Sequence, residues 1–123
     1  MGLSSEHTRV AEFAAGEVLF SEGDPGDAMF ILREGRIELR KRVEGAEQLL
    51  KVVDTPNDFF GEMAVLDDLP RSATAVATVD SSVLIVDDEA FEQLVLENGK
   101  FALKVIKVLS DRVRCTNQEM SEL

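Results

Sequence analysis

The chain has 123 residues, and its 24 acidic and 13 basic side chains give it a formal net charge of -11. This length fits one domain with a buried core, and the acidic balance argues against a nucleic-acid partner, because phosphate backbones are bound by clustered Lys and Arg. No apolar run approaches the roughly 20 residues that a membrane span needs, and we find no signal-peptide pattern. With one cysteine, Cys115, and therefore no internal disulfide, we expect a cytoplasmic protein without a membrane partner.

The first two-thirds of the chain has the period of two that is typical of β-strands. We expect residues 1–7 to form a flexible tail and residues 8–13 to form the first strand. Further strands, rich in Val, Ile, Leu, Phe and Thr, are predicted at 17–20, 28–33, 36–43, 48–53, 72–79 and 82–87.

The spacers between these strands have the chemistry of turns. Residues 22–27 (EGDPGD) combine glycines with a proline, and 34–35 and 44–47 are short enough for hairpins. Many short strands at regular spacing predict an antiparallel sandwich or barrel. We therefore expect a mainly β fold, with a jelly-roll-like β-roll over residues 8–87 and C-terminal α-helices over residues 88–123.

The period changes to that of a helix from Asp88 onward. Asp87 or Asp88 is the expected N-cap, and Gly99 is the expected C-terminal stop of this helix. A second helix is predicted from about Lys100 to the end of the chain. The first helix places three apolar residues on one side, namely Phe91, Leu94 and Val95.

The second helix carries an apolar seam with alternating spacings of four and three. Such a seam is typical of a helix that pairs with another helix. A helix packed on its own β-roll explains Phe101, Leu103 and Val105 better, so both explanations stay open for the first half, while a partner helix is favoured for the second. The seam consists of Ala102, Ile106, Leu109, Val113, Thr116, Met120 and Leu123.

The stretch from Phe59 to Ala77 (FFGEMAVLDDLPRSATAVA) interrupts the strand pattern with one helical turn. The first backbone N–H groups of a helix have no partners inside it, and the helix dipole favours an anion there. Gly61 and Ala64 leave room for close approach, and Arg71 supplies a planar fork that suits a phosphate. This arrangement predicts a local phosphate site in an otherwise acidic chain.

Glu62 lies in the same stretch and cannot favourably contact a phosphate, because both are anionic. A carboxylate beside a phosphate needs a hydroxyl donor, and in a nucleotide the nearest is a ribose 2′-OH. A 3′,5′-cyclic phosphate leaves this hydroxyl free. The alternative is a purely structural salt bridge between Arg71 and Glu62 that closes the loop.

Two longer stretches carry a family resemblance. Residues 14–39 (AAGEVLFSEGDPGDAMFILREGRIEL) and 60–75 (FGEMAVLDDLPRSATA) resemble the cyclic nucleotide-binding domains of catabolite-activator-type regulators, kinase regulatory subunits and gated channels. The second stretch resembles the phosphate-binding cassette, which we place at 59–74. Asn57 stands where many members have glycine, and asparagine also tolerates left-handed backbone geometry.

The resemblance implies a role for each matching residue. Backbone N–H groups of Gly61 and Ala64 bind the phosphate, Glu62 binds the ribose 2′-OH, and Arg71 binds the phosphate. Two more residues, Ser72 and Ala73, complete the anion pocket, and the candidate ligand-binding set also includes Phe60 and Met63.

Two residues near the end of the chain are further candidates. The stretch RCTNQE resembles the place where catabolite-activator-type dimers set a hydroxyl against the adenine amino group. Thr116 would then contact the base from its own chain, and Asn117 would reach in from the partner's helix. The alternative is that Thr116 is a tolerated hydroxyl on an apolar seam.

We therefore expect a stand-alone module that binds a cyclic nucleotide, cAMP before cGMP, and relays its presence through the C-terminal helices to an unknown downstream protein, with a homodimer as its possible form. A phosphodiesterase would need metal-ligand clusters, yet the only histidine is His7, so we expect neither enzyme activity nor a metal. Haem would need an axial ligand at His7 or Cys115 without a supporting motif. The remaining alternative is a degenerate relative that binds a protein or another small effector.

Overall fold

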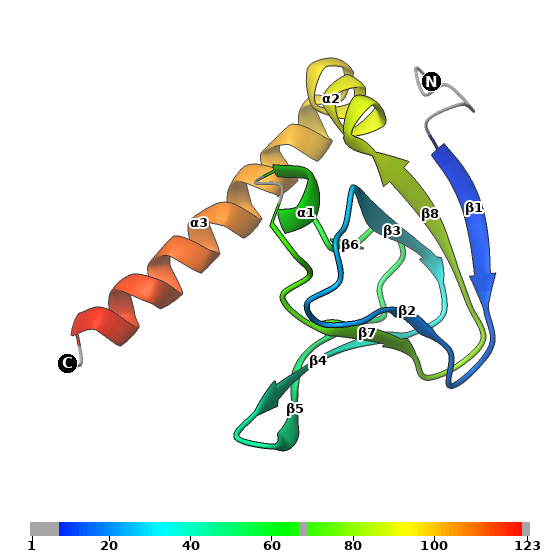
Figure 1. Cartoon of the computed structure of the whole chain (residues 1–123). Coiled ribbons are helices and arrows are strands. Elements are labelled where there is room, and N and C mark those ends of the chain that lie inside the picture. The colour runs from blue at the N-terminus through cyan, green and yellow to red at the C-terminus, as the bar shows by residue number, and fades with distance from the viewer. Residues whose placement is uncertain (1–7, 67–68, 122–123) are drawn as a thin grey trace.

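The structure is a computed structural model that describes residues 8–66 and 69–121, and among these the side chains of 63 and 112–121 are not described. The fold is mainly β, with helices after the last strand, as predicted (Figure 1). The strands are β1 (Thr8–Phe13), β2 (Val18–Phe20), β3 (Ala28–Glu34), β4 (Ile37–Val43), β5 (Ala46–Val53), β6 (Phe59–Phe60), β7 (Thr74–Ala77) and β8 (Ser81–Asp87). The helices are α1 (Met63–Leu66), α2 (Asp88–Glu97) and α3 (Gly99–Ser121).

The strands form two antiparallel sheets with the orders β1-β8-β3-β6 and β2-β7-β4-β5. In the first sheet β3 pairs with both β8 and β6, and in the second β4 pairs with both β7 and β5. The chain passes repeatedly from one sheet to the other (Figure 1), so both walls of the roll contain strands that are distant in sequence. This confirms the predicted β-roll.

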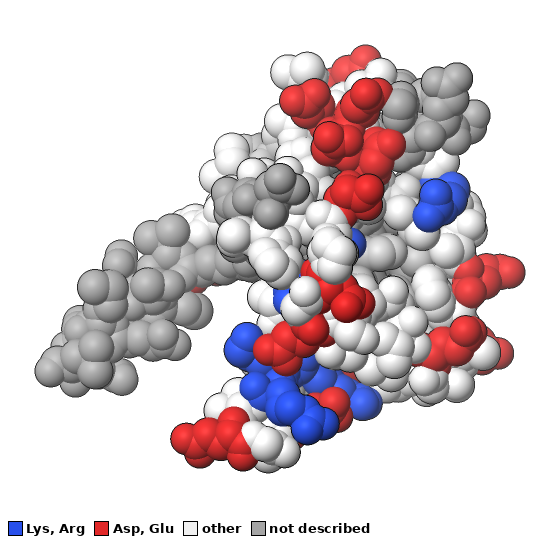
Figure 2. Space-filling view, in the orientation of Figure 1, with Lys and Arg blue, Asp and Glu red and all other residues white. Residues whose placement is uncertain are grey.

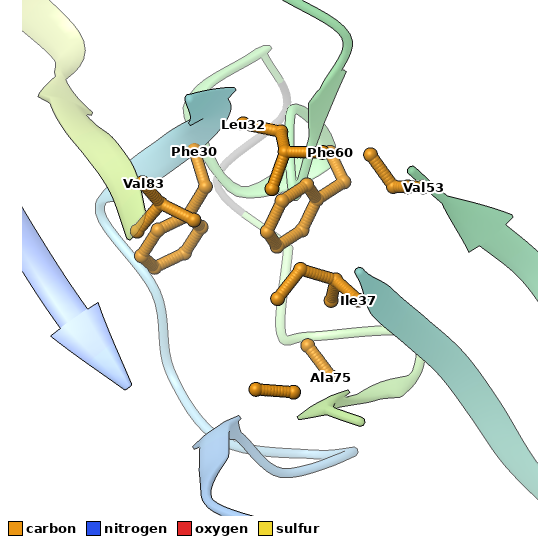
Figure 3. Packing of buried hydrophobic residues seen from close by; sticks show 8 residues of the cluster. Phe30, Leu32, Ile37, Val53, Phe60, Ala75 and Val83 are labelled. Atoms are coloured by element: carbon orange, nitrogen blue, oxygen red, sulfur yellow. The ribbon is translucent and has the colours of Figure 1, made fainter. Parts of the chain in front are cut away.

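The inner faces of the two sheets enclose the larger core. Its side chains point toward one another in Figure 3, with Phe30, Leu32 and Val83 from the first sheet and Ile37 and Val53 from the second. The ring centroids of Phe30 and Phe60 are 5.3 Å apart. Burial of these apolar side chains provides most of the driving force for closing the roll.

A second core attaches the helices to the first sheet. Met29 and Val86, which are paired neighbours on β3 and β8, pack with Ala90 and Phe91 of α2 and with Val105 of α3. Because successive strand residues face opposite sides, β3 contributes Met29 to this core and Phe30 to the core inside the roll. The helices are thus packed on the outer face of the sheet that carries β6.

The turns use the predicted residues. Glu44 and Gly45 have φ values of 51° and 82°, the left-handed pair that a tight hairpin between β4 and β5 requires. Asn57 has φ 76°, so it adopts the left-handed geometry expected where related sequences carry glycine. Its N–H donates to the carbonyl of Leu32, which fixes the loop that leads into β6.

The junction between α2 and α3 differs from the sequence-based prediction, whereas the start of α2 agrees with it. Asp87 caps α2 as expected, its carboxylate accepting from the N–H of Ala90 at 2.9 Å. Gly99, however, is the first residue of α3 rather than the stop of α2. Asn98 separates the two helices, because its extended backbone ends α2 and its side-chain oxygen accepts from the N–H of Phe101 at 3.1 Å.

Candidate ligand-binding site

One pocket brings together most of the residues proposed from the sequence. It lies between the segment from β6 to α1 and the entrance of β7, and residues of β2, β4 and β5 complete its wall. The predicted residues that line it are Phe60, Gly61, Glu62, Ala64, Arg71, Ser72 and Ala73; the additional lining residues are Phe20, Leu39, Lys51 and Phe59.

Arg71 is the buried cation of this pocket. Only 8% of its surface is exposed, and its Cζ lies 4.3 Å from the ring centroid of Phe20 and 5.4 Å from that of Phe30. Its Nη1 donates to the carbonyl oxygen of Gly61 at 3.1 Å, while Nε is buried without a hydrogen-bond partner among the described residues. A buried guanidinium with an unused donor is suited to an anionic ligand.

Burial lowers the pKa of the Arg71 guanidinium from its ordinary value, because desolvation disfavours the charged form. The carboxylates of Asp27 and Asp24 act in the opposite direction. The contacts of Arg71 with Gly61 and with the two rings give no support to the alternative in which its role is a salt bridge to Glu62. An anion bound at the guanidinium would offset the cost of its desolvation.

Glycines make room for this side chain. A Cβ at Gly26 would lie 2.5 Å from Cζ and 2.8 Å from Nη2 of Arg71, and a Cβ at Gly61 would lie 2.9 Å from Nη1. Gly61 also has φ 77°, a conformation that favours glycine. The glycine at 61 was singled out from the sequence, whereas the role of Gly26 depends on a contact between distant segments and left no local signal.

The helical turn begins two residues after the left-handed residue Gly61. We predicted that this turn begins at about Gly61, but α1 starts at Met63. The carbonyl of Glu62 accepts from the N–H groups of Val65 and Leu66, and the side chain of Glu62 is buried, with 3% of its surface exposed. A buried carboxylate and the first N–H groups of α1 therefore share one wall of the pocket.

Three candidates cannot be placed in the pocket. Met63 is the first residue of α1, and Thr116 and Asn117 lie in α3, but the side chains of all three are outside the described residues. The predicted contact of Thr116 and Asn117 with a base stays a prediction.

Lys104 of α3 contacts the segment that precedes the pocket. Its Nζ donates to the carbonyl oxygen of Asn57 at 2.6 Å and lies 2.8 Å from the carboxylate of Asp58. The same ammonium lies 5.5 Å from the ring centroid of Phe59, a pocket residue whose ring is 5.6 Å from that of Phe101 on α3. Helix α3 is therefore in direct contact with the pocket wall.

On the face drawn in Figure 2, Asp and Glu side chains lie in several separate groups, while Lys and Arg gather near the β4–β5 hairpin. Two of those cations are paired with carboxylates: Arg40 Nη2 lies 2.8 Å from Glu38, and Lys41 Nζ lies 3.2 Å from Glu22. Within the described ranges no group of His, Cys, Asp and Glu could hold a metal ion. Over those ranges, too, no helix is long and apolar enough to cross a membrane.

The comparison with family models identifies the family of the chain. Residues 10–98 match the model of the cyclic nucleotide-binding domain, so the chain belongs to this family. The match contains the whole pocket wall from β2 to β7 and ends at the junction between α2 and α3.

The known proteins that are similar to this chain include transcriptional regulators and an enzyme. A CRP-like cAMP-activated global transcriptional regulator of Mycobacterium tuberculosis is 29% identical over 91% of the chain, which spans half of that regulator. The catabolite activator protein of Thermus thermophilus aligns with a TM-score of 0.83 and 28% identity over 98% of the chain and 60% of its own. The EAL enzyme Bd1971 in its cAMP-bound form aligns with a TM-score of 0.68 and 27% identity over 92% of the chain and 30% of its own. Its cGMP-bound form aligns with a TM-score of 0.70 and 29% identity over 90% of the chain and 30% of its own.

Proposed function

We propose that the chain is a regulatory module that binds cAMP, with cGMP as the second ligand, and that passes the occupancy of its pocket to another protein through α3. The observation that carries this proposal is the buried guanidinium of Arg71, which faces the glycine-containing segment before α1 with its Nε unpartnered among the described residues. A cyclic phosphate supplies the anion that this donor lacks.

Each pocket residue has a chemical role in this proposal. Arg71 pairs with the phosphate, and the N–H groups near Gly61 and Ala64 donate to its oxygens. Glu62 accepts from the ribose 2′-OH, because a buried carboxylate so close to a phosphate is better matched to a hydroxyl than to a second anion. Ser72 and Ala73 close the wall at the entrance of β7.

The preference for cAMP rests on the relatives. The mycobacterial regulator is described as cAMP-activated, while the Bd1971 domain is described in forms with either purine. Ser72 does not decide between them, because a hydroxyl after the arginine is compatible with both.

The proposed relay of pocket occupancy to α3 depends on the contacts of Lys104 and Phe101. Both are on α3, and both contact the segment 57–59 that leads directly into the pocket wall. A ligand that moves this segment therefore changes contacts that hold α3, which gives the two states different energies.

A second copy of the chain is the proposed neighbour of α3. Phe101, Val105 and Leu109 pack on the roll, whereas Leu103 and Ile106 are 61% and 59% exposed. The sequence left open whether Leu103 packs on the roll; Phe101 and Val105 occupy that face, and Leu103 points away from it. We infer that this exposed face meets the same face of a partner. The module has no catalytic role in this proposal and acts in the cytoplasm through a downstream protein.

Calorimetric titration of the purified chain with cAMP, cGMP and 5′-AMP tests the ligand class. We expect saturable binding of the cyclic nucleotides, with cAMP tighter, and much weaker binding of 5′-AMP, whose phosphate carries more charge and is not tied back to the ribose. Binding of 5′-AMP as tight as that of cAMP would contradict a site built for a cyclic phosphate.

A further inference from the structure

Glu22 lies in the loop between β2 and β3, and none of the proposed ligand contacts uses it. The loop follows β2, a strand of three residues that pairs with β7 at the edge of its sheet. The pairing of β4 with β7 ends at Arg40 and Thr74, so residues 41–43 of β4 extend past the start of β7. The side chain of Glu22 reaches this part of β4.

Glu22 bonds to both neighbouring strands. Its Oε1 accepts from the backbone N–H of Arg42 at 3.0 Å, and its Oε2 accepts from Nζ of Lys41 at 3.2 Å. The backbone N–H of Glu22 donates to Oγ1 of Thr74 at 2.9 Å. The N–H of Arg42 and then Lys41 lower the pKa of Glu22, because both favour the charged carboxylate. One residue thus joins β4 to the start of β7 where direct strand pairing has ended.

Lys41 extends this connection to the residue after Arg71. Its Nζ donates to the carbonyl oxygen of Ser72 at 3.3 Å as well as to Glu22. The side chains of Lys41 and Glu22 are 43% and 31% exposed, and an exposed ion pair by itself contributes little to stability. The bonds to main-chain atoms matter more here, because they fix the backbone of β4 relative to the entrance of β7.

The segment around Glu22 holds Arg71 at three points. The ring centroid of Phe20 lies 4.3 Å from Cζ of Arg71. The N–H of Gly23 donates to the carbonyl of Arg71, and the N–H of Arg71 donates to the carbonyl of Asp24, both at 2.8 Å. Glu22 lies in the middle of this segment, and its side chain bonds the segment to β4. Loss of these bonds would free the ring and both backbone partners of Arg71 to move.

We propose that Glu22 is a positioning residue of the phosphate site, an inference that rests on the proposed cyclic nucleotide function. Glu22 is outside the set of described residues that line the pocket, so it acts through Arg71 and not on the ligand. A guanidinium that is already fixed in place loses less freedom when the phosphate binds. Lys41 assists by holding the carbonyl of Ser72.

A purely structural explanation of Glu22 makes a different prediction. The N–H of Arg42 needs an acceptor, and Glu22 would then serve only to complete the sheet. In that case, replacing Glu22 lowers the melting temperature but leaves the affinity of the folded chain unchanged. Positioning predicts instead a loss of affinity that depends on the presence of Arg71.

Calorimetric titration of cAMP into the whole chain, Glu22→Ala and Glu22→Gln tests the proposal, at a temperature where circular dichroism shows each chain to be folded. We expect Glu22→Ala to weaken binding about tenfold, a loss comparable to that of one hydrogen bond. Glu22→Gln keeps an oxygen for the N–H of Arg42 and loses only the charge beside Lys41. It should therefore bind within about threefold of the unmodified chain.

Glu38→Ala is the matched control. Glu38 is an ion-paired glutamate on β4, and its partners are Arg36 and Arg40 rather than the loop that carries Glu22. The substitution removes the same charge from the same sheet and should leave the affinity for cAMP unchanged.

Two further measurements show whether Glu22 acts through Arg71. In an Arg71→Lys background, titrated with millimolar cAMP, Glu22→Ala should weaken binding by less than about twofold, because the guanidinium that it positions is gone. In the NMR spectrum without ligand, the ring of Phe20 shifts the Nε–Hε signal of Arg71. This signal should move toward that of an exposed arginine in Glu22→Ala and stay in place in Glu38→Ala.

Lys41→Met provides the same test if Glu22→Ala does not fold. It removes the bond to the carbonyl of Ser72 and the ion pair with Glu22, and it should weaken cAMP binding about threefold in the presence of Arg71 only. Unchanged affinity in the folded variants, or an equal loss in the Arg71→Lys background, would overturn the positioning role and leave the cyclic nucleotide function intact. An unmodified chain that binds no cyclic nucleotide would overturn both proposals.

Discussion

The side chain of Arg71 joins the two halves of the pocket through its 3.1 Å hydrogen bond to the carbonyl oxygen of Gly61. The backbone of Arg71 is fixed as well, since its N–H donates to the carbonyl of Asp24 and its carbonyl accepts from the N–H of Gly23. The loop 21–27, the entrance of β7 and the segment before α1 thus meet at one residue. A phosphate at this guanidinium would contact a position that is held before the ligand arrives, which reduces the cost of binding.

Gly26→Ala should weaken cyclic nucleotide binding at least tenfold without touching the ligand. The added Cβ would overlap the Arg71 guanidinium, so the side chain must leave its place over the ring of Phe20. Overpacking of this kind costs typically about 1–3 kcal/mol. Titration with cAMP and thermal unfolding of the same variant measure the two effects.

Gly99→Ala is the control for this substitution. Nothing lies within 4 Å of a Cβ at Gly99, and its backbone is helical, so alanine should leave binding unchanged. If Gly26→Ala binds cAMP as tightly as the unmodified chain, the fixed position of Arg71 is not required for the site.

Glu62→Gln should weaken cAMP binding by about 1.5–3 kcal/mol, the usual worth of a hydrogen bond to a charged group. A double-mutant cycle with the 2′-deoxy cyclic nucleotide locates this loss. The deoxy ligand should bind poorly to the unmodified chain, and Glu62→Gln should lose little more with it. Additive losses would show that Glu62 does not contact the ribose.

Lys104→Met should loosen α3 against the segment that leads to the pocket. The substitution removes the hydrogen bond to the carbonyl of Asn57 and the ion pair with Asp58, so amide exchange at residues 99–111 should accelerate without ligand. In the unmodified chain, cAMP should change exchange over the same residues. Lys107→Met, an exposed lysine on the same helix, is the control. Exchange that is insensitive to cAMP would contradict the relay through α3.

Dimerisation through α3 should tighten when cAMP is bound, because linkage is reciprocal. Analytical ultracentrifugation over a concentration series, with and without cAMP, measures it. Ile106→Glu should weaken the dimer by placing a charge on the exposed apolar face, whereas Leu96→Glu on α2, where the leucine is 84% exposed, should not. If the chain is a monomer both with and without cAMP, the proposed dimer is wrong, and the proposed relay through α3 would act within one chain.

The fold was predictable where the pattern is local. Alternation located the strands, and turn chemistry located the β4–β5 hairpin, whose Glu44 and Gly45 adopt left-handed conformations. β6 was not predicted, because a strand of two residues is too short to show alternation; pairing of Phe59 and Phe60 with β3 is what makes it a strand. Gly99 was misassigned because Asn98 both ends α2 and caps α3.

The pocket was predictable in part for the same reason. Gly61, Glu62 and Arg71 belong to one stretch whose chemistry is visible in the sequence. Phe20 and Lys51 come from β2 and β5, and only the folding of both sheets brings them to the same pocket. Such residues leave no mark in a short motif, because their role depends on strand pairing rather than on neighbours in sequence.

The measurement that tests the account most directly is the titration of Arg71→Ala with cAMP beside the unmodified chain. Loss of the guanidinium leaves a buried phosphate without its partner, at a cost of about 2–5 kcal/mol, so we expect tight binding to be lost while circular dichroism shows a folded β-roll. Arg71→Lys should also bind weakly, because an ammonium cannot reproduce the planar fork. A folded Arg71→Ala chain that binds cAMP with the affinity of the unmodified chain would contradict the assignment of this pocket as the phosphate site.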